Sequence, residues 1–460
     1  MPTMLACRRA KRGGKTMFAK HRIQAAGRRR LAESRAGTKE RLVPAVLAAC
    51  LLWLAGLGGL TGCSTSAAKR TRYQYDPAYG VESPEFLRSL QTLRAGIRPD
   101  NKVELLENGD GLFPRMTADF RQARKSINIE LYIFSNDTLG RQLAEVLVER
   151  ARDGVEVRVL VDAVGARLGP LETTLKAAGV KLRIYKPIRL YALHKIEDRT
   201  HRKIVVVDGQ VGYCGGFCFD ARWQGNAGSR DEWRDLAVRV EGPVVAQLQS
   251  IFLEDWLHTT GEVLHGEAHF PANPLCGDKL AQAVSSSRGD QASMSKLMVY
   301  MALQAARKRI FIANAYFVPD SQIRRALVQA VARGVDVRVV IPGPNMDIPL
   351  SRHASRYHQD ELLRGGVKIY EYQPTMLHSK AMVVDGLWSS IGSINLNARS
   401  FKQNAEANVV IYDYDFARQV EKAIEDDIAK SRLITWEQYR RRGLCARLTQ
   451  LWASLFAEKY

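Results

Sequence analysis

Two histidines, His201 and His378, begin the same pattern of side chains in two distant parts of the chain. In each, a lysine follows two positions later, an aspartate five positions beyond the lysine, and a glycine seven positions beyond the aspartate. An imidazole beside an ammonium group is electrostatically unfavourable unless an anion lies between them, and a phosphodiester meets that need. The pattern therefore predicts chemistry at a phosphate group. The side chains are His201, Lys203 and Asp208 in the first motif, and His378, Lys380 and Asp385 in the second.

Each motif leads into a short apolar run with the character of a β-strand, IVVVD in the first copy and AMVVD in the second. Side chains two positions apart point to the same face of a strand. The histidine and the lysine of each motif are therefore expected to converge on one spot. There Lys203 and Lys380 would neutralise phosphate oxygens as point charges.

The residues after each motif extend the predicted phosphate site. Ser393 and Asn395 can donate hydrogen bonds to a phosphoryl oxygen. In the first copy Cys218 stands where the second copy has Asn395, so one amide donor is missing. Two outcomes are open: phosphate oxygens are bound more weakly on that side, or Gly215 and Gly216 supply backbone amides in its place, since glycine permits close approach of the backbone.

Asp208 and Asp385 directly follow the two apolar runs. Two roles are open for them. They can take part in catalysis, or they can hold the turn that ends each strand.

The elements that must position these side chains are also repeated. Four segments recur in the same order with nearly constant spacing, which indicates an internal duplication. The matches are 126–137 with 309–320, 151–162 with 331–343, 179–187 with 366–374, and the two histidine motifs.

Each repeat alternates apolar, β-branched runs with segments of helical spacing. RKSINIELYIF is followed by GRQLAEVLVERARDG and then by VEVRVLVD, and the same order returns as IFIANAYF, SQIRRALVQAVARG and VDVRVVIPG. Strands alternating with helices of this length favour βαβ units. The chain is therefore predicted to be an α/β protein of two halves, residues 91–270 and 271–435. Each half is expected to hold a mixed, mainly parallel sheet flanked by helices.

The positive charge of the chain is concentrated at its N-terminus. Of the formal net charge of +20, residues 1–41 carry +11, with thirteen Lys and Arg against two Glu, which leaves +9 for the rest. Residues 42–60 are an uncharged apolar run, as expected of a secretory signal or an N-terminal anchor. The basic block is therefore not interpreted as a nucleic-acid-binding arm.

The apolar run ends in Leu-Thr-Gly-Cys, which resembles the bacterial lipoprotein cleavage box and implies lipidation of Cys63. Residues 1–62 are then the basic region and signal, and 63–90 a polar tether. The alternative is an uncleaved signal anchor, which gives the same orientation. In both cases the catalytic region is expected in the bacterial cell envelope, anchored to a membrane and outside the cytoplasm, on the periplasmic side.

The C-terminal residues 436–460 are predicted to form a basic amphipathic helix. Its apolar positions are Leu444, Leu448, Leu451, Trp452 and Leu455, and several arginines precede them. Such a helix can lie on an anionic membrane surface, or it can pack on the core of the protein itself. Both interpretations are open.

The paired motifs resemble the phospholipase D superfamily, whose signature is this His-Lys-Asp pattern, over about residues 90–440. The resemblance implies a duplicated phospholipase D-like fold, with two halves packed about a pseudo-twofold axis and both motifs in one active site. It implies that His201 attacks the phosphodiester to give a phosphohistidine, and that His378 protonates the leaving alcohol and then activates the acceptor. No cofactor and no metal ion are expected.

Further segments are similar to bacterial cardiolipin synthases of that superfamily: ERARDGVEVRVLVDAVG, NAYFVPD and HSKAMVVDGLWSSIGSINLNARSF. Asp235 and Glu406 stand at matching places after the two motifs. A nucleophilic histidine needs a carboxylate that fixes its tautomer and ring orientation, and we assign that role to these two residues.

Three functions are compatible with these residues. The first is a phosphatidyltransferase that makes cardiolipin, acting on phospholipids such as phosphatidylglycerol at a membrane surface. The second is a phospholipase D-type hydrolase or a nuclease with the same catalytic groups, although no nucleic-acid partner is expected. The third is an inactive envelope lipid-binding protein, against which the intact histidines and lysines argue.

Overall fold

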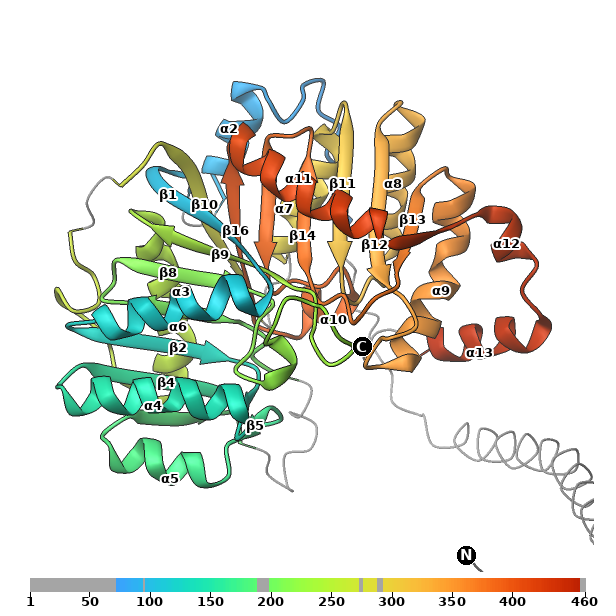
Figure 1. The fold of residues 1–460 in the computed structure, drawn as a ribbon. Coiled ribbons are helices and arrows are strands. Elements are labelled where there is room, and N and C mark those ends of the chain that lie inside the picture. The colour runs from blue at the N-terminus through green and yellow to red at the C-terminus, as the bar shows by residue number, and fades with distance from the viewer. Residues whose placement is uncertain (1–71, 94–95, 188–197, 273–275, 288–292, 456–460) are drawn as a thin grey trace, which may run out of the picture. The chain divides into compact units, whose positions relative to one another are not determined.

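A mixed sheet carries both halves of the duplication, and its two ends have the same strand order. The computed structural model describes residues 72–93, 96–187, 198–272, 276–287 and 293–455 (Figure 1). In these residues 15 strands form one sheet in the order β17-β13-β12-β11-β14-β15-β16-β10-β1-β9-β8-β7-β2-β4-β6. Read outward from the central β1·β10 pair, β1, β9, β8, β7, β2, β4 and β6 correspond to β10, β16, β15, β14, β11, β12 and β13.

The elements of the first half are β1 (Arg98–Glu107), α3 (Asn108–Gln122), β2 (Ser126–Leu131), β3 (Phe134–Ser135), α4 (Thr138–Arg152), β4 (Glu156–Asp162), β5 (Ala166–Arg167), α5 (Pro170–Ala177), β6 (Lys181–Tyr185), β7 (Ile204–Val207), β8 (Val211–Gly215), the 3₁₀ turn η2 (Ala221–Trp223), β9 (Leu236–Glu241) and α6 (Val244–Thr260).

Those of the second half are β10 (Lys279–Ser286), α7 (Met294–Ala305), β11 (Arg309–Asn314), α8 (Ser321–Ala332), β12 (Asp336–Pro342), α9 (Pro349–Arg364), β13 (Lys368–Tyr372), β14 (Lys380–Val384), β15 (Trp388–Gly392), α10 (Ala398–Lys402), β16 (Glu406–Tyr412), α11 (Tyr414–Ala429) and β17 (Ser431–Ile434).

The duplication is visible in how the repeated helices begin. Asp137 precedes α4 and accepts a hydrogen bond from the Gly140 amide at 2.9 Å. Asp320 precedes α8 and accepts from the amides of Gln322 and Ile323. Such capping satisfies backbone donors that the first helical turn leaves free. Equivalent aspartates therefore start equivalent helices in the two halves.

The predicted duplicated α/β fold with a mixed sheet flanked by helices is confirmed, but the sheet differs from the prediction in two details. First, the halves share one sheet, because β1 pairs with β10 in an antiparallel, irregular register through Arg98–Ala281 and Asn101–Lys279. Second, within this large sheet only β2–β4–β6 and β11–β12–β13 are parallel, and its other strand pairs are antiparallel. The parallel prediction holds where a helix crosses between strands. It fails among other places at β7–β8 and β14–β15, where a tight turn joins the two strands and can only connect antiparallel neighbours.

Those tight turns lie directly after the two motifs. Asp208 and Gly209 connect β7 to β8 with φ of 52° and 65°, and Asp385 and Gly386 connect β14 to β15 with φ of 54° and 69°. Positive φ at both central residues gives the turn whose twist matches a two-stranded hairpin, and Asp-Gly is a preferred sequence for it. Each motif is thus the first strand of a hairpin.

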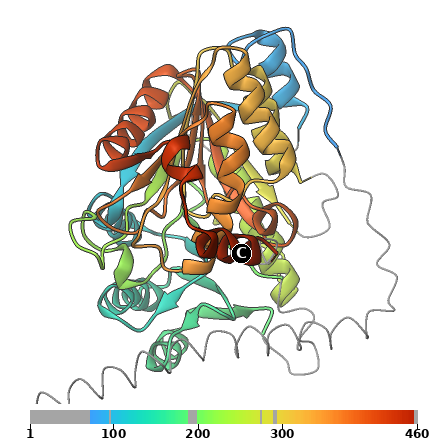
Figure 2. The same cartoon turned by 90° about the vertical axis from the view of Figure 1, so that its right-hand side faces the viewer.

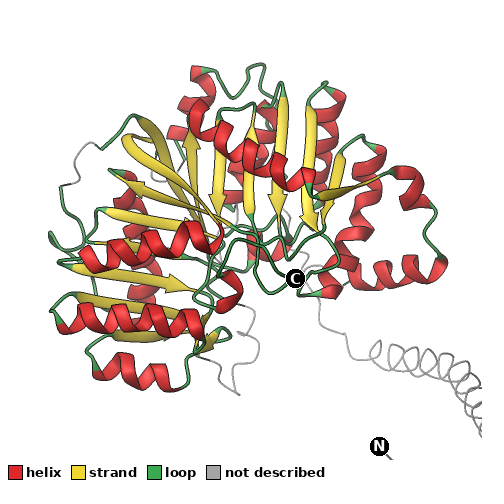
Figure 3. Cartoon of the chain, in the orientation of Figure 1, coloured by secondary structure: helices red, strands yellow, loops and turns green. Residues whose placement is uncertain are grey.

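Buried side chains on alternate faces of the strands hold the layers together. In β7, Val205 and Val207 face the core under α3, α4 and α5, while Ile204 and Val206 face a second core. That second core contains residues of α6, of α11 and of strands from both halves. A strand covered on both faces is apolar throughout instead of alternating. Figure 3 shows helices on both faces of the strands.

The predicted tether at 63–90 is shorter than expected. Within the described residues, α2 (Pro84–Gln91) buries Phe86 and Leu90 in the core of the second half, together with Val81. The sequence is polar enough to look like a linker, but its few apolar residues are spaced to fill that core. Residues before 72, which include the apolar run and Cys63, lie outside the described part of the chain.

The C-terminal segment forms two helices where one was predicted. α12 (Trp436–Arg440) and α13 (Leu444–Ser454) are separated at Gly443. α13 lies beside α9, as the rotated view in Figure 2 shows. In the described ranges, none of the helices combines the length and the apolarity needed to cross a bilayer.

Candidate active site

The two motifs meet because backbone bonds attach each one to the opposite half. The amide of His201 donates to the carbonyl of Ala405 at 2.8 Å, and the amide of His378 donates to the carbonyl of Arg234 at 2.7 Å. Both contacts are parallel β-bridges, at Thr200–Ala405 and at Arg234–Leu377. The histidines therefore enter one site from opposite directions.

Each histidine is paired with a carboxylate of the other half. His201 Nδ1 lies 2.9 Å from Glu406 Oε2, and His378 Nδ1 lies 2.8 Å from Asp235 Oδ2. A carboxylate at Nδ1 holds the proton there and leaves Nε2 unprotonated to act as nucleophile or base. The sequence pointed to these carboxylates, and the structure shows in addition that the pairing is crossed.

Glu406 is fixed by two serine hydroxyls. Ser393 Oγ donates to Oε2 at 2.5 Å, and Ser400 Oγ donates to Oε1 at 2.6 Å. The Ser393 hydroxyl also accepts from the Ala407 amide at 3.0 Å. The Ser393 hydroxyl therefore orients the carboxylate, while its contact with phosphate stays a prediction. Ser400 was not anticipated from the sequence.

Asp235 is held by different groups from those that hold Glu406. Its Oδ2 accepts from the indole Nε1 of Trp223 at 2.8 Å, and its Oδ1 accepts from the Leu236 amide at 2.8 Å. The two histidine–carboxylate pairs are thus equivalent in geometry but not in the residues that support them. No pattern in the sequence indicated this role of Trp223.

Gly215 and Gly216 provide space beside these carboxylates. A Cβ atom on Gly216 would lie 2.4 Å from Asp235 Oδ1, and one on Gly215 would lie 2.7 Å from the Cβ of Ala237. The Gly216 amide donates to the carbonyl of Leu236 at 3.4 Å. Gly216 therefore allows close packing against Asp235, and Gly215 is a strand residue of β8, while their contacts with phosphate stay predictions.

Asn395 is the remaining predicted phosphate contact. Its side chain is buried, and its Oδ1 atom has no hydrogen-bond partner in the described structure. A buried amide oxygen without a partner is costly, so a donor group arriving with a ligand would stabilise it. Cys218, at the equivalent place in the first half, is buried in the apolar core, and burial raises the pKa of its thiol.

The two lysines lie beside their histidines in a closed environment. Lys203 Nζ donates to the carbonyl of His201 at 2.7 Å, and Lys380 Nζ donates to the carbonyl of His378 and lies 3.0 Å from its Nδ1. Burial lowers the pKa of both ammonium groups, that of Lys380 to about 7, and the charge of Lys203 adds to this effect. An anion between them would relieve the repulsion.

Burial also lowers the histidine pKa values, to about 4 for His201 and about 3 for His378, despite their carboxylate partners. Burial alone would raise the pKa of Asp235 and Glu406, but the adjacent histidines and lysines hold both below their usual values. The site therefore holds neutral imidazoles, two carboxylates and two crowded cations. A phosphate anion would raise the histidine pKa values and allow one imidazole to act as an acid.

Asp208 and Asp385 do not point their carboxylates at this cluster. Asp208 accepts hydrogen bonds at 2.7–2.8 Å from the amides of Arg124, Lys125 and Ser126, which lead into β2. Asp385 does the same at 2.7–2.9 Å with residues 307–309, which lead into β11. Of the two roles left open by the sequence, these bonds favour the structural one.

Aromatic rings form the walls around the histidines. The rings of Trp223 and Trp233 both have centroids 5.0 Å from that of His378, and Tyr316 lies at 6.2 Å. Tyr132 lies 5.3 Å from His201. Tyr132 and Tyr316 occur in the repeated segments at 126–137 and 309–320, but one position out of register, so the duplication did not identify them. Apolar walls restrict water around the reacting atoms.

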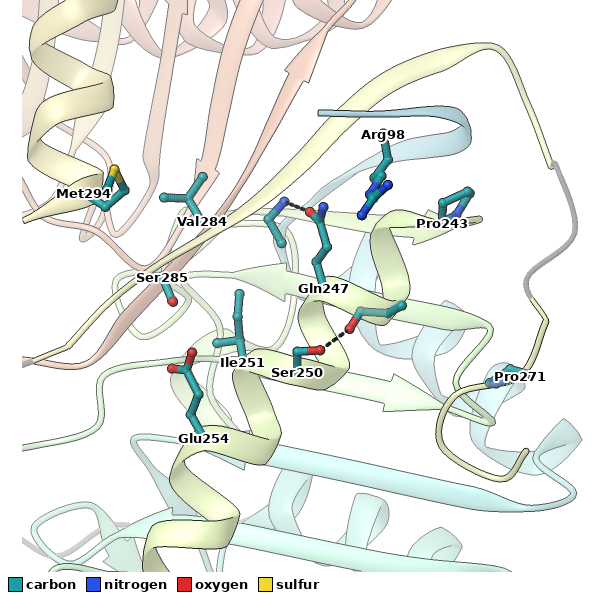
Figure 4. Close-up of a pocket in the computed structure, with 12 residues that line it drawn as sticks. Arg98, Pro243, Gln247, Ser250, Ile251, Glu254, Pro271, Val284, Ser285 and Met294 are labelled. Carbon is teal, nitrogen blue, oxygen red and sulfur yellow. Dashed lines mark hydrogen bonds between the residues drawn. The ribbon is translucent and has the colours of Figure 1, made fainter. Parts of the chain in front are cut away.

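A surface pocket of about 620 Å³ lies apart from the motif residues, between α6 and β10 (Figure 4). Gln247, Ser250 and Glu254 of α6 line one side. Glu254 accepts a hydrogen bond at 2.7 Å from buried Arg202, whose neighbours in sequence are His201 and Lys203. The pocket therefore reaches the first motif only through Arg202, on the side away from the side chains of His201 and Lys203.

The arrangement suits a two-step displacement at phosphorus. One Nε2 can attack while the other imidazole donates a proton, and two ammonium groups can neutralise the phosphate oxygens. Across the described residues, no group of three or more His, Cys, Asp or Glu is placed to hold a metal ion.

Comparison with known proteins gives a consistent result. The family described as "Cardiolipin synthase, PLD-like domain" matches residues 116–256 and 299–428. The chain is 35% identical over 376 residues to "Probable cardiolipin synthase YwiE" of Bacillus subtilis, covering 81% of this chain and 75% of that one. It is 37% identical over 365 residues to "Cardiolipin synthase A" of Pseudomonas putida, covering 78% and 75%.

A solved structure shares the fold at low sequence identity. The phosphatidylserine synthase of Haemophilus influenzae superposes with a TM-score of 0.61 at 14% identity, over 80% of this chain and 96% of that one.

Proposed function

We propose, from the premise that the chain belongs to the cardiolipin synthase family of phospholipase D-like proteins, that it is a phosphatidyltransferase that forms cardiolipin. The observation that carries the proposal is the crossed pairing of His201 with Glu406 and of His378 with Asp235 around two buried lysines. This arrangement supplies a nucleophile, an acid and phosphate-neutralising charges in one site.

In the first step, His201 Nε2 attacks the phosphorus of a phosphatidyl donor. The bond from phosphorus to the headgroup oxygen breaks, and His378, protonated once the phosphate anion is bound, gives its proton to the departing alcohol. Lys203 and Lys380 neutralise the non-bridging oxygens. The product is a phosphatidyl group bonded to His201.

In the second step, neutral His378 removes the proton from the hydroxyl of the acceptor lipid. The oxygen attacks phosphorus, and the bond to His201 breaks. With phosphatidylglycerol as donor and as acceptor, the products are cardiolipin and glycerol. Water in place of the acceptor would give phosphatidic acid, so exclusion of water by Tyr132, Tyr316 and Trp233 supports transfer over hydrolysis.

Purified full-length protein in vesicles of phosphatidylglycerol tests this proposal, with the lipid products separated and identified. Cardiolipin with equimolar glycerol is expected. Phosphatidic acid without cardiolipin would identify a hydrolase, DNA cleavage without lipid turnover would identify a nuclease, and absence of all three activities would leave a lipid-binding protein.

The roles of the two histidines can be separated by trapping the intermediate. In the His378→Ala variant, a phosphatidyl group is expected to accumulate on the peptide that contains His201, because its transfer to the acceptor is slowed. His201→Ala is expected to carry no such group. Mass spectrometry of the digested protein reads both outcomes, and label on position 378 in place of 201 would reverse the assignment.

We also propose that the protein works outside the cytoplasm, on the periplasmic side of a bacterial membrane, anchored by a lipid on Cys63. The apolar run at 42–60 directly before Leu-Thr-Gly-Cys supports this, although these residues lie outside the described structure. Labelling of growing cells with a fatty-acid analogue should mark the wild-type chain and not Cys63→Ser. Equal labelling of both would exclude Cys63 as the lipidated residue.

A further inference from the structure

Helix α13 presents its large apolar side chains to the outside. Leu444, Leu448, Leu451 and Leu455 are 71%, 56%, 44% and 72% exposed. The buried residues of the same helix are Gln450 and Ala453. A helix that packs only on its own protein normally has the opposite arrangement, with leucine inside.

The four leucines form one continuous stripe. Positions 444, 448, 451 and 455 fall within about 60° of the helix circumference, at roughly 100° per residue. Ala453 lies on the opposite side, where it packs against Val318, Ala354 and Leu350. The small side of α13 therefore attaches it to the protein, and its leucine stripe faces outward.

The segment around the stripe is strongly basic. Residues 438–455 contain four arginines and no acidic residue. Arg440, Arg441 and Arg447 are exposed, while Arg442 lies over the ring of Tyr439. Exposed leucine beside unpaired basic charge is the composition of helices that lie in the interface of an anionic bilayer.

The residues on which α13 packs are connected to the active site. Ala453 packs on Val318, whose amide donates to the carbonyl of Leu396 at 3.1 Å. Leu396 directly follows Asn395, and Tyr316, two residues before Val318, borders His378. Figure 2 shows α13 beside α9, whose residues complete this support.

We propose that α12 and α13 form a docking surface for an anionic phospholipid bilayer. The leucine stripe enters the region between headgroups and acyl chains, and the arginines remain among the phosphates. This contact presents the membrane surface to the loops that hold Tyr316 and Asn395. The binding itself does not depend on the proposed transferase activity, although the choice of lipid as the occupant fits it.

A bilayer fits this surface better than a second copy of the chain. Two copies joined through their stripes would bring two sets of four arginines together with a single acidic residue, Glu437, in residues 436–455 of each copy. Like charges at a desolvated interface are destabilising. An anionic lipid surface supplies the opposite charge.

An environment-sensitive fluorescent amino acid, placed in the full chain at position 448 or at 449, tests the proposal. Thr449 is the matched control because it is exposed on the same helix but lies outside the stripe. With phosphatidylglycerol–phosphatidylcholine vesicles, the probe at 448 should shift to shorter wavelength and be quenched several-fold more by nitroxide-labelled lipid than the probe at 449. Arg440→Glu combined with Arg441→Glu should weaken this response at least several-fold.

The docking surface is overturned if the probe at 448 stays in water in the presence of these vesicles, or if it is already shielded before vesicles are added. Equal quenching at 448 and 449 would also overturn it, since the stripe would then have no special role. Because the readout is fluorescence, a protein without transferase activity could still pass the test, and an active synthase could still fail it.

Discussion

His201 and Glu406, joined by a hydrogen bond of 2.9 Å across 205 positions of sequence, belong to different halves of the duplication. His378 and Asp235 repeat the relationship in the opposite direction at 2.8 Å. Neither half therefore contains both a catalytic histidine and the carboxylate that orients it. Several measurable consequences depend on this crossed pairing.

Removal of the charge on Glu406 should reduce catalysis with little loss of stability. Glu406→Gln keeps the size of the side chain, but its single amide oxygen can accept from only one of Ser393 and Ser400, and the uncharged amide no longer fixes the Nδ1 proton of His201. Loss of such an orienting partner typically costs about 10–100-fold. Turnover in phosphatidylglycerol vesicles should fall by at least this factor, while the thermal midpoint changes little. Unchanged turnover would exclude the orienting role.

A methyl group at position 216 should displace the carboxylate of Asp235. Gly216→Ala places a Cβ 2.4 Å from Asp235 Oδ1, so Asp235 must move away from His378. We expect turnover to fall at least about 10-fold, by the same loss of orientation. Gly111→Ala is the control, because its nearest neighbour would be 3.9 Å away. If both variants retain wild-type turnover, Asp235 does not need its observed position.

Substitution of Asp385 should affect folding more than chemistry. In Asp385→Ala, the amides of Arg307, Lys308 and Arg309 lose their acceptor, at a cost of about 1–3 kcal/mol for unsatisfied groups. The midpoint of denaturant unfolding should fall, while turnover measured well below the unfolding transition should stay within a few-fold of wild type. A large loss of turnover at unchanged stability would instead indicate the catalytic role.

Affinity for the phospholipid should weaken as pH rises through about 7. Burial, with the charge of Lys203 adding to it, lowers the pKa of Lys380 to about 7, so the free site loses one positive charge in this range. KM should rise more steeply than kcat falls, since bound phosphate stabilises the charged form. A KM that is constant between pH 6 and 9 would contradict this.

Acidification below about pH 6.5 should destabilise the unliganded protein. The folded pKa of His201 is lowered to about 4 from a usual value of 6.5, so the unfolded chain binds more protons between these values. The contribution of His201 to stability is complete above about 6.5 and is lost as pH falls towards 4. His201→Gln should flatten the dependence of the thermal midpoint on pH in this window.

The duplication and the side chains of the motifs could be predicted because both depend on short sequence patterns. A sequence could also predict the Asp-Gly turns after β7 and β14 and the aspartate caps of α4 and α8, since each depends on neighbours in sequence. The sharing of one sheet was not, because the β1·β10 pair joins residues about 180 positions apart and has an irregular register.

The sequence predicts phosphate contacts for Ser393 and Gly216 from their chemistry, and the structure adds that they hold and accommodate the two carboxylates. Trp223 and Ser400 lie only 12 and 6 positions before the carboxylates they contact, but neither pair lies within one helix or strand, so no periodic pattern identifies them. The stripe on α13 was visible in the sequence, whereas the direction it faces required the structure.

The crossed pairing also determines when the protein can become reactive during its synthesis. His201 leaves the ribosome 205 residues before Glu406, and until that residue arrives the imidazole lacks the group that orients it. A chain that ends before Glu406 thus lacks the group that orients His201. The pairing of His378 runs the other way, because Asp235 precedes it by 143 positions, so His378 finds its carboxylate already made and His201 does not.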